Sequence, residues 1–146
     1  MTDKQQIKEV VETVSELQDM KQWERLESYF VEKPFIDNKA LSGEMPAIMP
    51  KKRLIESWSR EIGSYFYATR HFIRSLVVRM QNSRKAKVTT AIEHIHYVAD
   101  RGERYAWTVK GTIEYIVVKT AGGNWKISQM IYKIQDQMVR PVGAAA

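Results

Sequence analysis

Hydrophobic positions repeat with a helical period near the start of the chain. Charged residues four positions apart, Lys8, Glu12 and Glu16, support a helix there through i, i+4 contacts. Five apolar side chains fall at the i, i+3, i+4, i+7 spacing of one helix face: Ile7, Val10, Val11, Val14 and Leu17. The pattern predicts an amphipathic helix with one buried stripe.

Two shorter helices are predicted downstream. Trp23, Leu26 and Phe30 continue the helical spacing over a short span. A brief strand is expected at 35–38, and the loop "KALSGEMPAIMP" then leads to Pro50, which suits the first turn of a helix. The buried stripe of this third helix consists of Leu54, Ile55, Trp58 and Ile62.

From residue 67 onward the hydrophobic period changes to two. Four stretches are rich in β-branched and aromatic residues: 68–81, 86–98, 104–119 and 125–139. The segments "NSRK", "DRG" and "AGGN" between them are typical of hairpin turns. We therefore expect an α+β fold in which three N-terminal helices pack on a curved antiparallel sheet. One domain would span residues 1–140, with a flexible tail at 141–146.

The three histidines of the chain fall on the first two of these strands. If "NSRK" forms a tight hairpin, His71 lies directly opposite His96, and His94 lies on the same face. The same register places Arg74 against Glu93, an opposite-charge cross-strand pair. Convergence of the three rings on one concave face favours a functional site over three separate core histidines.

The two faces of this hairpin predict different surroundings. The histidine face is apolar at one end and polar at the other, which suits a pocket for a small apolar or cyclic ligand. The reverse face is too apolar to remain in water, and we expect it to form a homodimer interface. Its apolar members are Phe72, Leu76, Val78, Met80, Ala91, Ile95 and Tyr97.

Composition narrows the classes of function. A chain of 146 residues is long enough for one core and one pocket. It has no cysteine, which excludes disulfides, thiolate nucleophiles and sulfur-ligated zinc. Because neither a signal peptide nor a membrane-spanning run is recognisable, we expect a cytoplasmic protein with no membrane partner.

Charge and motifs indicate few partners. The net charge is +6, but its densest groups, "KKR" at 51–53 and "SRKAK" at 83–87, are short and separate, so we do not expect nucleic acid as a partner. The chain shows no metal-ligand spacing, no phosphate-binding glycine loop and no nucleophile with its base. We therefore expect no metal and no cofactor.

The order of elements resembles a known family. The helix "MKQWERLESYF", the strand "PFIDN", a third helix with a central tryptophan and "RHFI" opening the sheet resemble the SnoaL-like polyketide cyclase branch of the nuclear transport factor type superfamily. The resemblance covers residues 5–140. It implies a cystatin-like α+β barrel, a cone with an internal pocket. The scytalone dehydratases are the nearest enzymes within this superfamily.

The resemblance also implies roles for particular residues. Scytalone dehydratases use a histidine pair on adjacent strands for acid/base catalysis, which implies this role for His71 and His96. Their aspartate four residues before a tryptophan is matched by Asp19 before Trp23. Two tyrosines that position a catalytic water are replaced here, by Gln18 and Asn38.

Other candidates come from the same comparison and from the pocket face. Thr112 and Glu114 resemble a serine and an asparagine of the dehydratases, although the register leaves open whether Thr108 or Thr112 lies near His96. Glu114 would be a general base in an apolar cavity. The substrate-binding candidates are Asn38, Trp58, His94, Thr112 and Glu114.

Some of these residues have a structural interpretation as well. Asp19 with Gln22 three positions later fits an N-capping box for the second helix. His94 fits the wall or rim of a pocket. Trp58 and Trp125 have the spacing of core residues.

Two hypotheses for the function remain. In the first, the chain is a cofactor-independent lyase, such as a dehydratase, or an isomerase or cyclase that acts on a small cyclic or polyketide-like substrate. One histidine removes a carbon-bound proton next to a carbonyl, its partner assists an oxygen to leave or move, and Asp19 orients a histidine. In the second, the chain is a non-catalytic ligand-binding or dimerisation module of the same fold.

Overall fold

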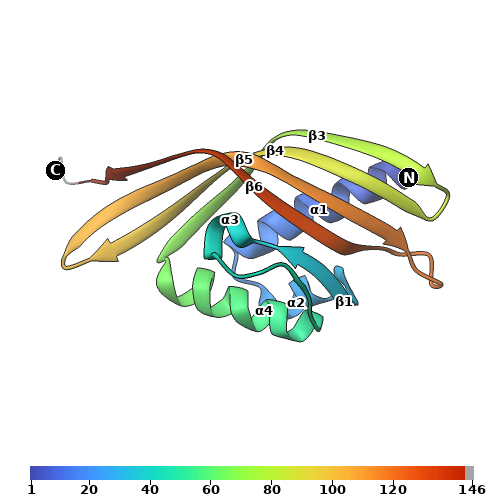
Figure 1. Cartoon of the computed structure of the whole chain (residues 1–146), viewed down its shortest axis with the longest axis horizontal. Helices are drawn as coiled ribbons and strands as arrows, with labels where there is room; N and C mark the ends of the chain where they lie inside the picture. Colours follow the sequence, from blue (N-terminus) through green and yellow to red (C-terminus); the bar gives the residue numbers. More distant parts are fainter. Residues whose placement is uncertain (144–146) are drawn as a thin grey trace.

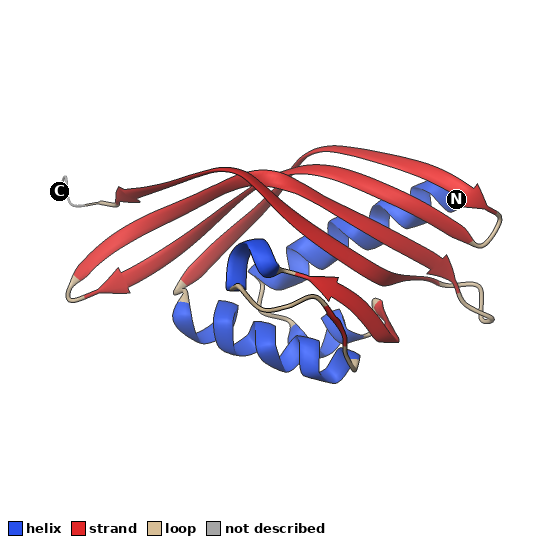
Figure 2. Cartoon of the chain, viewed as in Figure 1, coloured by secondary structure: helices blue, strands red, loops and turns tan. Residues whose placement is uncertain are grey.

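One curved six-stranded sheet with helices against one of its faces forms the architecture (Figures 1 and 2). The computed structural model describes residues 1–143. Its strands are β1 (Phe30–Asp37), β2 (Ala47–Ile48), β3 (Ala68–Asn82), β4 (Lys85–Asp100), β5 (Glu103–Lys119) and β6 (Trp125–Pro141). Its helices are α1 (Asp3–Asp19), α2 (Trp23–Glu27), α3 (Lys39–Ser42) and α4 (Lys51–Arg60), which a π-helical turn, η1 (Glu61–Tyr65), extends.

The three predicted helices are confirmed. Helix α1 begins with a capping box, in which Thr2 Oγ1 accepts from the Gln5 backbone N–H and the Gln5 side chain accepts from the Thr2 N–H. Four residues of its predicted stripe are buried: Ile7, Val11, Val14 and Leu17. Helix α4 buries Leu54, Ile55 and Trp58 against the sheet, as its spacing predicts.

The segment between α2 and α4 is more structured than expected. Phe30, expected in the second helix, opens β1, and the predicted loop contains α3 and β2. Strand β1 pairs in parallel with β6, which adds it to the sheet beyond the meander. The sheet order is therefore β2-β1-β6-β5-β4-β3.

The four-stranded antiparallel meander is confirmed, with its turns at the three predicted segments. Residues 141 and 142, expected in a flexible tail, are hydrogen-bonded to the sheet. Pro141 pairs with Tyr105, and the Val142 N–H donates to the Arg104 carbonyl. Residues 144–146 of the expected tail lie outside the described residues.

Two irregularities in β3 change the predicted pairing of β3 with β4. At the turn, Asn82 pairs with Lys85, as a tight hairpin requires. One irregularity then lies between Met80 and Asn82, and a second lies between Ile73 and Ser75. Each adds one residue to β3, so the pairing beyond both of them has shifted by two positions.

This shift corrects the predicted partners of the histidines. His71 lies opposite His94, and His96 lies opposite Thr69. The prediction that His71 directly faces His96 is therefore wrong. A shift of two nevertheless keeps all three histidines on one face, because side chains alternate between faces with a period of two.

The bulge at Arg74 also reverses the faces of β3 between the two irregularities. Leu76, Val78 and Met80 pack against the core, whereas Val77 is 50% exposed. The prediction that these three residues lie on the outer face is wrong. Arg74 still forms an ion pair with Glu93 across the outer face, at 3.4 Å, although the two are not directly paired.

Strands β5 and β6 approach each other closely at Gly111, in the curved part of the sheet. Gly111 on β5 pairs with Ile134 on β6 beside a further irregularity, and a Cβ at residue 111 would overlap the Lys133 carbonyl oxygen. Only glycine leaves this backbone contact free. The core fills the concave side of the bend, where Phe30 and Trp58 meet edge to face with ring centroids 5.7 Å apart.

Candidate functional site

The three histidines form a buried cluster on the concave face of the sheet. The ring centroid of His71 lies 4.3 Å from that of His94 and 6.1 Å from that of His96, and the rings of His94 and His96 are 6.3 Å apart. The His71 side chain and the whole residues His94 and His96 are each 4% exposed. The predicted convergence on one face is confirmed, with His94 rather than His96 as the nearest neighbour of His71.

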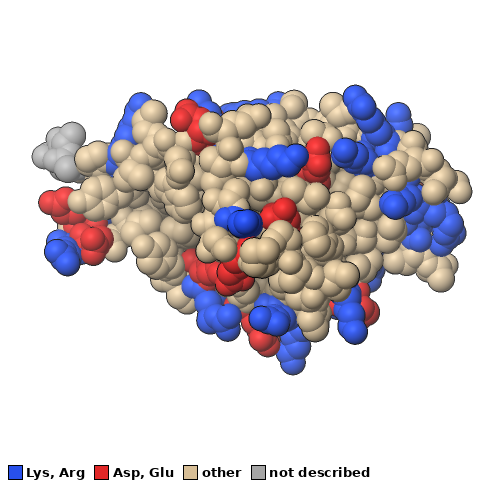
Figure 3. Space-filling model, in the orientation of Figure 1, with Lys and Arg blue, Asp and Glu red and all other residues tan. Residues whose placement is uncertain are grey.

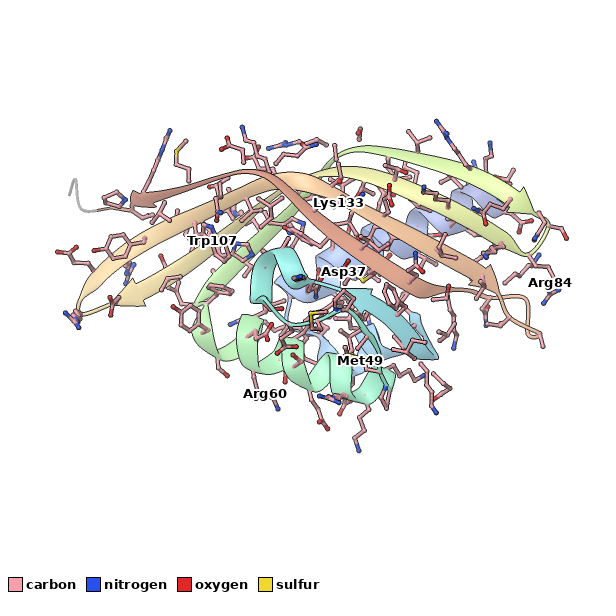
Figure 4. The ribbon with its side chains drawn as sticks, in the orientation of Figure 1. Asp37, Met49, Arg60, Arg84, Trp107 and Lys133 are labelled. Atoms are coloured by element: carbon pink, nitrogen blue, oxygen red, sulfur yellow. The ribbon has the colours of Figure 1, made fainter. Side chains whose placement is uncertain are left out.

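The cluster lines a cavity of about 490 Å³ between the sheet and the layer of α4 and η1. Trp107 on β5 and Arg60 on α4 come from the two layers that enclose it (Figure 4). Its apolar lining consists of Leu41, Trp58, Ile62, Phe66, Trp107, Ile113 and Met130. Its polar lining, besides the histidines, includes Gln18, Asn38, Ser42, Glu44, Arg60, Glu61 and Tyr132.

Asp19 holds His71 from behind the cavity. Its Oδ2 accepts from the His71 backbone N–H at 2.9 Å, and its Oδ1 accepts from Thr69 Oγ1 at 2.9 Å and from the ring Nδ1 of His71. A carboxylate can only accept, so His71 Nδ1 carries the proton and Nε2 has a free lone pair. The arrangement is a carboxylate–histidine pair at the cavity wall.

The position of Asp19 breaks a local rule of helix chemistry. It is the last residue of α1, where the helix dipole disfavours negative charge and no basic residue stands in the last turn. The three hydrogen bonds from β3 offset this cost. The expected capping role is wrong, because the N-cap of α2 is Gln22 and no side-chain cap bond forms there.

His94 is held by Tyr132 on β6. The Tyr132 hydroxyl lies 2.9 Å from His94 Nδ1. Among the described residues, His94 Nε2 is the buried side-chain nitrogen or oxygen atom that lacks a hydrogen-bond partner. The structure thus leaves a second ring nitrogen of the cluster with unused bonding capacity.

His96 is held by a backbone group and two aromatic rings. Its Nδ1 donates to the Trp107 carbonyl oxygen at 3.1 Å, because that oxygen can only accept. The rings of Trp107 and Phe66 lie 4.7 Å and 4.8 Å from the His96 ring, measured between centroids. His96 Nε2 is therefore the free nitrogen of this ring.

Burial keeps two of the histidines neutral. Desolvation and the neighbouring His71 lower the pKa of His96 to about 4. Desolvation also lowers the pKa of His94 well below 6.5, and His71 and His96 add to this effect. Burial raises the pKa of Tyr132, so its hydroxyl keeps its proton.

The predicted substrate-binding residues divide into two groups. Asn38, Trp58 and His94 line the cavity. Thr112 and Glu114 do not, because they alternate with the inward-facing Ile113 and lie on the outer face of β5. Their expected place in the site is wrong.

The contacts and strand pairing of β5 show why Thr112 and Glu114 were wrongly assigned to the site. Glu114 lies 3.8 Å from Lys87 Nζ, a contact on the outer face. The residue of β5 that pairs with His96 is Trp107, so neither Thr108 nor Thr112 occupies that place. The shortened "DRG" turn alone could not reveal which residues of β5 face inward.

Sequence reasoning missed Tyr132, Phe66 and Trp107. Trp125 and Ile127 face the core, and a strict period of two would then place Tyr132 outside. An irregularity in the pairing between Gln129 and Ile127 adds one residue and turns Tyr132 inward. The aromatic composition of the strands indicated that such residues could line a pocket, but it did not specify which of them face the cavity.

The comparisons with known proteins identify the family. The model of the SnoaL-like domain family matches residues 1–131. The chain belongs to the SnoaL-like domain family. No curated protein matches the chain.

Several solved structures share the fold. The Kfla4162 protein from Kribbella flavida is 23% identical, with 93% of each chain covered and a TM-score of 0.84. A protein assigned as a candidate scytalone dehydratase from Novosphingobium aromaticivorans is 20% identical, covering 99% of this chain and 95% of that one, with a TM-score of 0.80. The hexachlorocyclohexane dehydrochlorinase LinA-type3 from Novosphingobium barchaimii is 10% identical, covering 97% and 90%, with a TM-score of 0.80.

A protein with a cystatin-like fold from Nostoc punctiforme also matches, at 14% identity over 91% of each chain with a TM-score of 0.70. These likenesses confirm the predicted α+β fold of the cystatin-like type. Within the described residues, no helix has the length and apolar character needed to cross a membrane.

Proposed function

We propose that this SnoaL-like protein is a lyase or isomerase that removes a carbon-bound proton from a small cyclic substrate. The observation that carries the proposal is the pair of Asp19 and His71 at the wall of an apolar cavity. A histidine with its Nδ1–H bonded to a carboxylate has its Nε2 lone pair available as a general base. This pairing needs no cofactor for proton transfer.

The base is His71 and not His96. Asp19 stabilises the imidazolium that forms when His71 Nε2 takes a proton. His96 has no carboxylate partner, and burial lowers its pKa to about 4, so it is a poor proton acceptor at neutral pH. Its free Nε2 instead accepts a hydrogen bond from a substrate hydroxyl or a water.

The cluster also contains a donor for a developing negative charge. When the Tyr132 hydroxyl donates to His94 Nδ1, His94 carries its proton on Nε2. This otherwise unpartnered N–H can stabilise an enolate oxygen or give a hydrogen bond to a leaving group. Base and donor belong to rings whose centroids are 4.3 Å apart.

The cavity sets the class of substrate. Its volume of about 490 Å³ and its lining of Trp58, Phe66 and Trp107 suit a molecule of one or two rings. Asn38 provides an amide for a substrate oxygen. The dehydratase and dehydrochlorinase names of two structural neighbours both denote eliminations, which begin or coincide with loss of a carbon-bound proton.

An exchange experiment tests the proposal without knowledge of the leaving group. A panel of cyclic ketones, hydroxyketones and halogenated rings is incubated with the protein in deuterated water and followed by proton NMR. We expect deuterium incorporation or elimination for at least one compound, and His71→Gln to reduce the rate by about 10²- to 10⁴-fold. Thr112→Val, on the outer face, is the control and retains the rate.

The same experiment also tests the alternative function, a non-catalytic ligand-binding module. Binding to the wild-type cavity is judged by chemical shift changes at His94 and His96. If compounds bind but undergo neither exchange nor elimination, the result favours the non-catalytic binding module. Equal rates for His71→Gln and the wild-type chain would remove His71 as the base.

Association of two chains through the outer sheet face stays a prediction. Its remaining apolar support is Phe72, Ala91, Ile95 and Tyr97, since the other three predicted members face the core. On the face drawn in Figure 3, acidic and basic side chains are mixed over the middle and basic side chains gather at the right-hand end. That nucleic acid is not a partner stays a prediction. Light scattering measures the oligomeric state directly. A cytoplasmic location also stays a prediction.

A further inference from the structure

The δ-nitrogens of the three clustered histidines all have partners outside the cluster. His71 Nδ1 contacts the Asp19 carboxylate, His94 Nδ1 contacts the Tyr132 hydroxyl, and His96 Nδ1 contacts the Trp107 carbonyl. Carboxylates, backbone carbonyls and similar groups are the usual outer partners of histidines that bind a metal through the opposite nitrogen. Here all three rings have such a partner at the same nitrogen.

Because the δ-nitrogens have these partners, the ε-nitrogens of the three rings are available to bind a ligand. One ring nitrogen from each histidine lies within 4.8 Å of one from each of the others. His94 Nε2 is buried without a hydrogen-bond partner among the described residues, which is costly unless something binds it. A shared ligand of the three rings would satisfy this atom.

We propose that His71, His94 and His96 bind one divalent transition-metal ion of the zinc class through their ε-nitrogens. Three imidazoles are a ligand set that suits zinc and its first-row neighbours. The Tyr132 hydroxyl can accept as well as donate, so it also supports the tautomer of His94 in which Nδ1 carries the proton and Nε2 is free. Nitrogens bound to tetrahedral zinc at about 2.0–2.1 Å are about 3.4 Å apart, so the rings must move closer together than the present spacing of up to 4.8 Å when an ion binds.

The electrostatics of the cluster favour an ion of this charge. A ligand histidine must be neutral, with the lone pair of one ring nitrogen free for the ion. The Asp19 carboxylate lies behind His71 and offsets part of the double positive charge. The remaining coordination position faces the cavity, as in zinc sites that keep one position for water or substrate.

The ion and the proposed base use the same atom. His71 Nε2 cannot accept a substrate proton while it is bound to a metal. Occupation of the site therefore competes with the acid/base reaction, so that zinc inhibits turnover and a chelator restores it. Metal binding itself does not depend on whether the protein has that activity.

The test measures binding without substrate. Protein dialysed against EDTA and then buffer is titrated with Zn²⁺ by calorimetry and with Co²⁺ by visible spectroscopy. We expect one ion per chain, and the intense visible bands of cobalt in a four-coordinate nitrogen site. Absence of such bands, or of a saturable single site for Zn²⁺, would overturn the proposal.

Matched variants separate the cluster from surface binding. His94→Gln should weaken Zn²⁺ binding by roughly 100-fold or more, since it removes a ligand rather than an outer partner. Tyr132→Phe removes only the outer partner and should weaken it by about 10- to 100-fold. Tyr115→Phe, a second buried tyrosine whose residue does not line the cavity, should leave affinity unchanged.

The variants also distinguish the possible failures. Circular dichroism checks folding, and Tyr132→Phe carries the test if His94→Gln does not fold. Equal Zn²⁺ affinity in the wild-type chain, Tyr132→Phe and Tyr115→Phe would overturn the proposal, because binding would then lie elsewhere. If exchange activity is found and persists with the site saturated by Zn²⁺, His71 is not a ligand. If exchange activity is not found, the binding results stand by themselves.

Discussion

The carboxylate of Asp19 holds both the backbone and the ring of His71, which lies 52 positions later in the chain. Oδ2 accepts from the His71 N–H at 2.9 Å, and Oδ1 accepts from the ring Nδ1. The two contacts fix the position of β3 against the end of α1 and the direction of the imidazole at once. The same residue therefore has a structural and a chemical role.

Asp19→Asn should reduce exchange activity by about 10²-fold or more, since the amide no longer stabilises the protonated ring. Asp19 acts through His71, so its removal should also move the acid limb of the pH–rate profile, which a purely structural role would leave in place. Glu114→Gln makes the same acid-to-amide change on the outer face and should keep both rate and profile. Identical profiles for all three proteins would contradict the role of Asp19.

Acid should destabilise the fold through His96. Its pKa is about 4 in the folded chain against an ordinary value of 6.5. Between these two pH values the imidazole is protonated in the unfolded chain and neutral in the folded chain. Stability is therefore full above about pH 6.5 and falls as the pH drops toward about 4, by about 3 kcal/mol for this group. His94, whose pKa is also lowered, adds to the loss in the same direction.

Urea unfolding from about pH 7 to about pH 4 measures this loss. His96→Gln should flatten the dependence, because it removes one of the two groups responsible. NMR titration of the ring signals gives the folded values directly. A His96 ring that titrates near 6.5 in the folded protein would contradict the assignment.

Leu76→Lys and Val77→Lys should have opposite outcomes. Leu76 packs against the core and Val77 is 50% exposed, because the bulge at Arg74 reverses the faces. A lysine at residue 76 should lower the free energy of unfolding by about 2–3 kcal/mol, and one at residue 77 should change it by about 0.5 kcal/mol or less. Denaturant unfolding measures both. The reverse order would restore the regular alternation predicted from the sequence.

Gly111→Ala should destabilise the bend of the sheet. The added Cβ would overlap the Lys133 carbonyl, so β5 and β6 must separate locally at a cost of about 1–3 kcal/mol. Gly122→Ala, in the turn before β6, is the control, because a Cβ there approaches no closer than 3.9 Å to Thr120 Oγ1. Equal thermal stability of the two variants would show that the strands are not held in this contact.

Much of the fold could be predicted because the hydrophobic period is a local property. The helical stripe from Ile7 to Leu17, the change to a period of two after residue 67 and the three turn segments each appear within a few positions. Helix and strand differ in the angle between successive side chains, and burial of one face imposes that angle on the sequence. Convergence of His94 and His96 with His71 followed from the same rule.

The rest depended on where the strands leave their regular pairing. A bulge adds one residue and turns every later side chain to the other face, and its position reflects how two distant backbones meet. The inward direction of Leu76 and Tyr132 and the outward direction of Glu114 could therefore not be predicted from spacing within one strand.

The sequence by itself determined helices α1, α2 and α4, the antiparallel meander from β3 to β6, the family and the face shared by the three histidines, since these depend on local periodicity and on residue types. Only the tertiary structure decided that Asp19 binds His71, that Tyr132 holds His94 and that His94 Nε2 lacks a partner. Those contacts join α1, β3, β4 and β6, and they exist only once the curved sheet has brought these elements around one cavity.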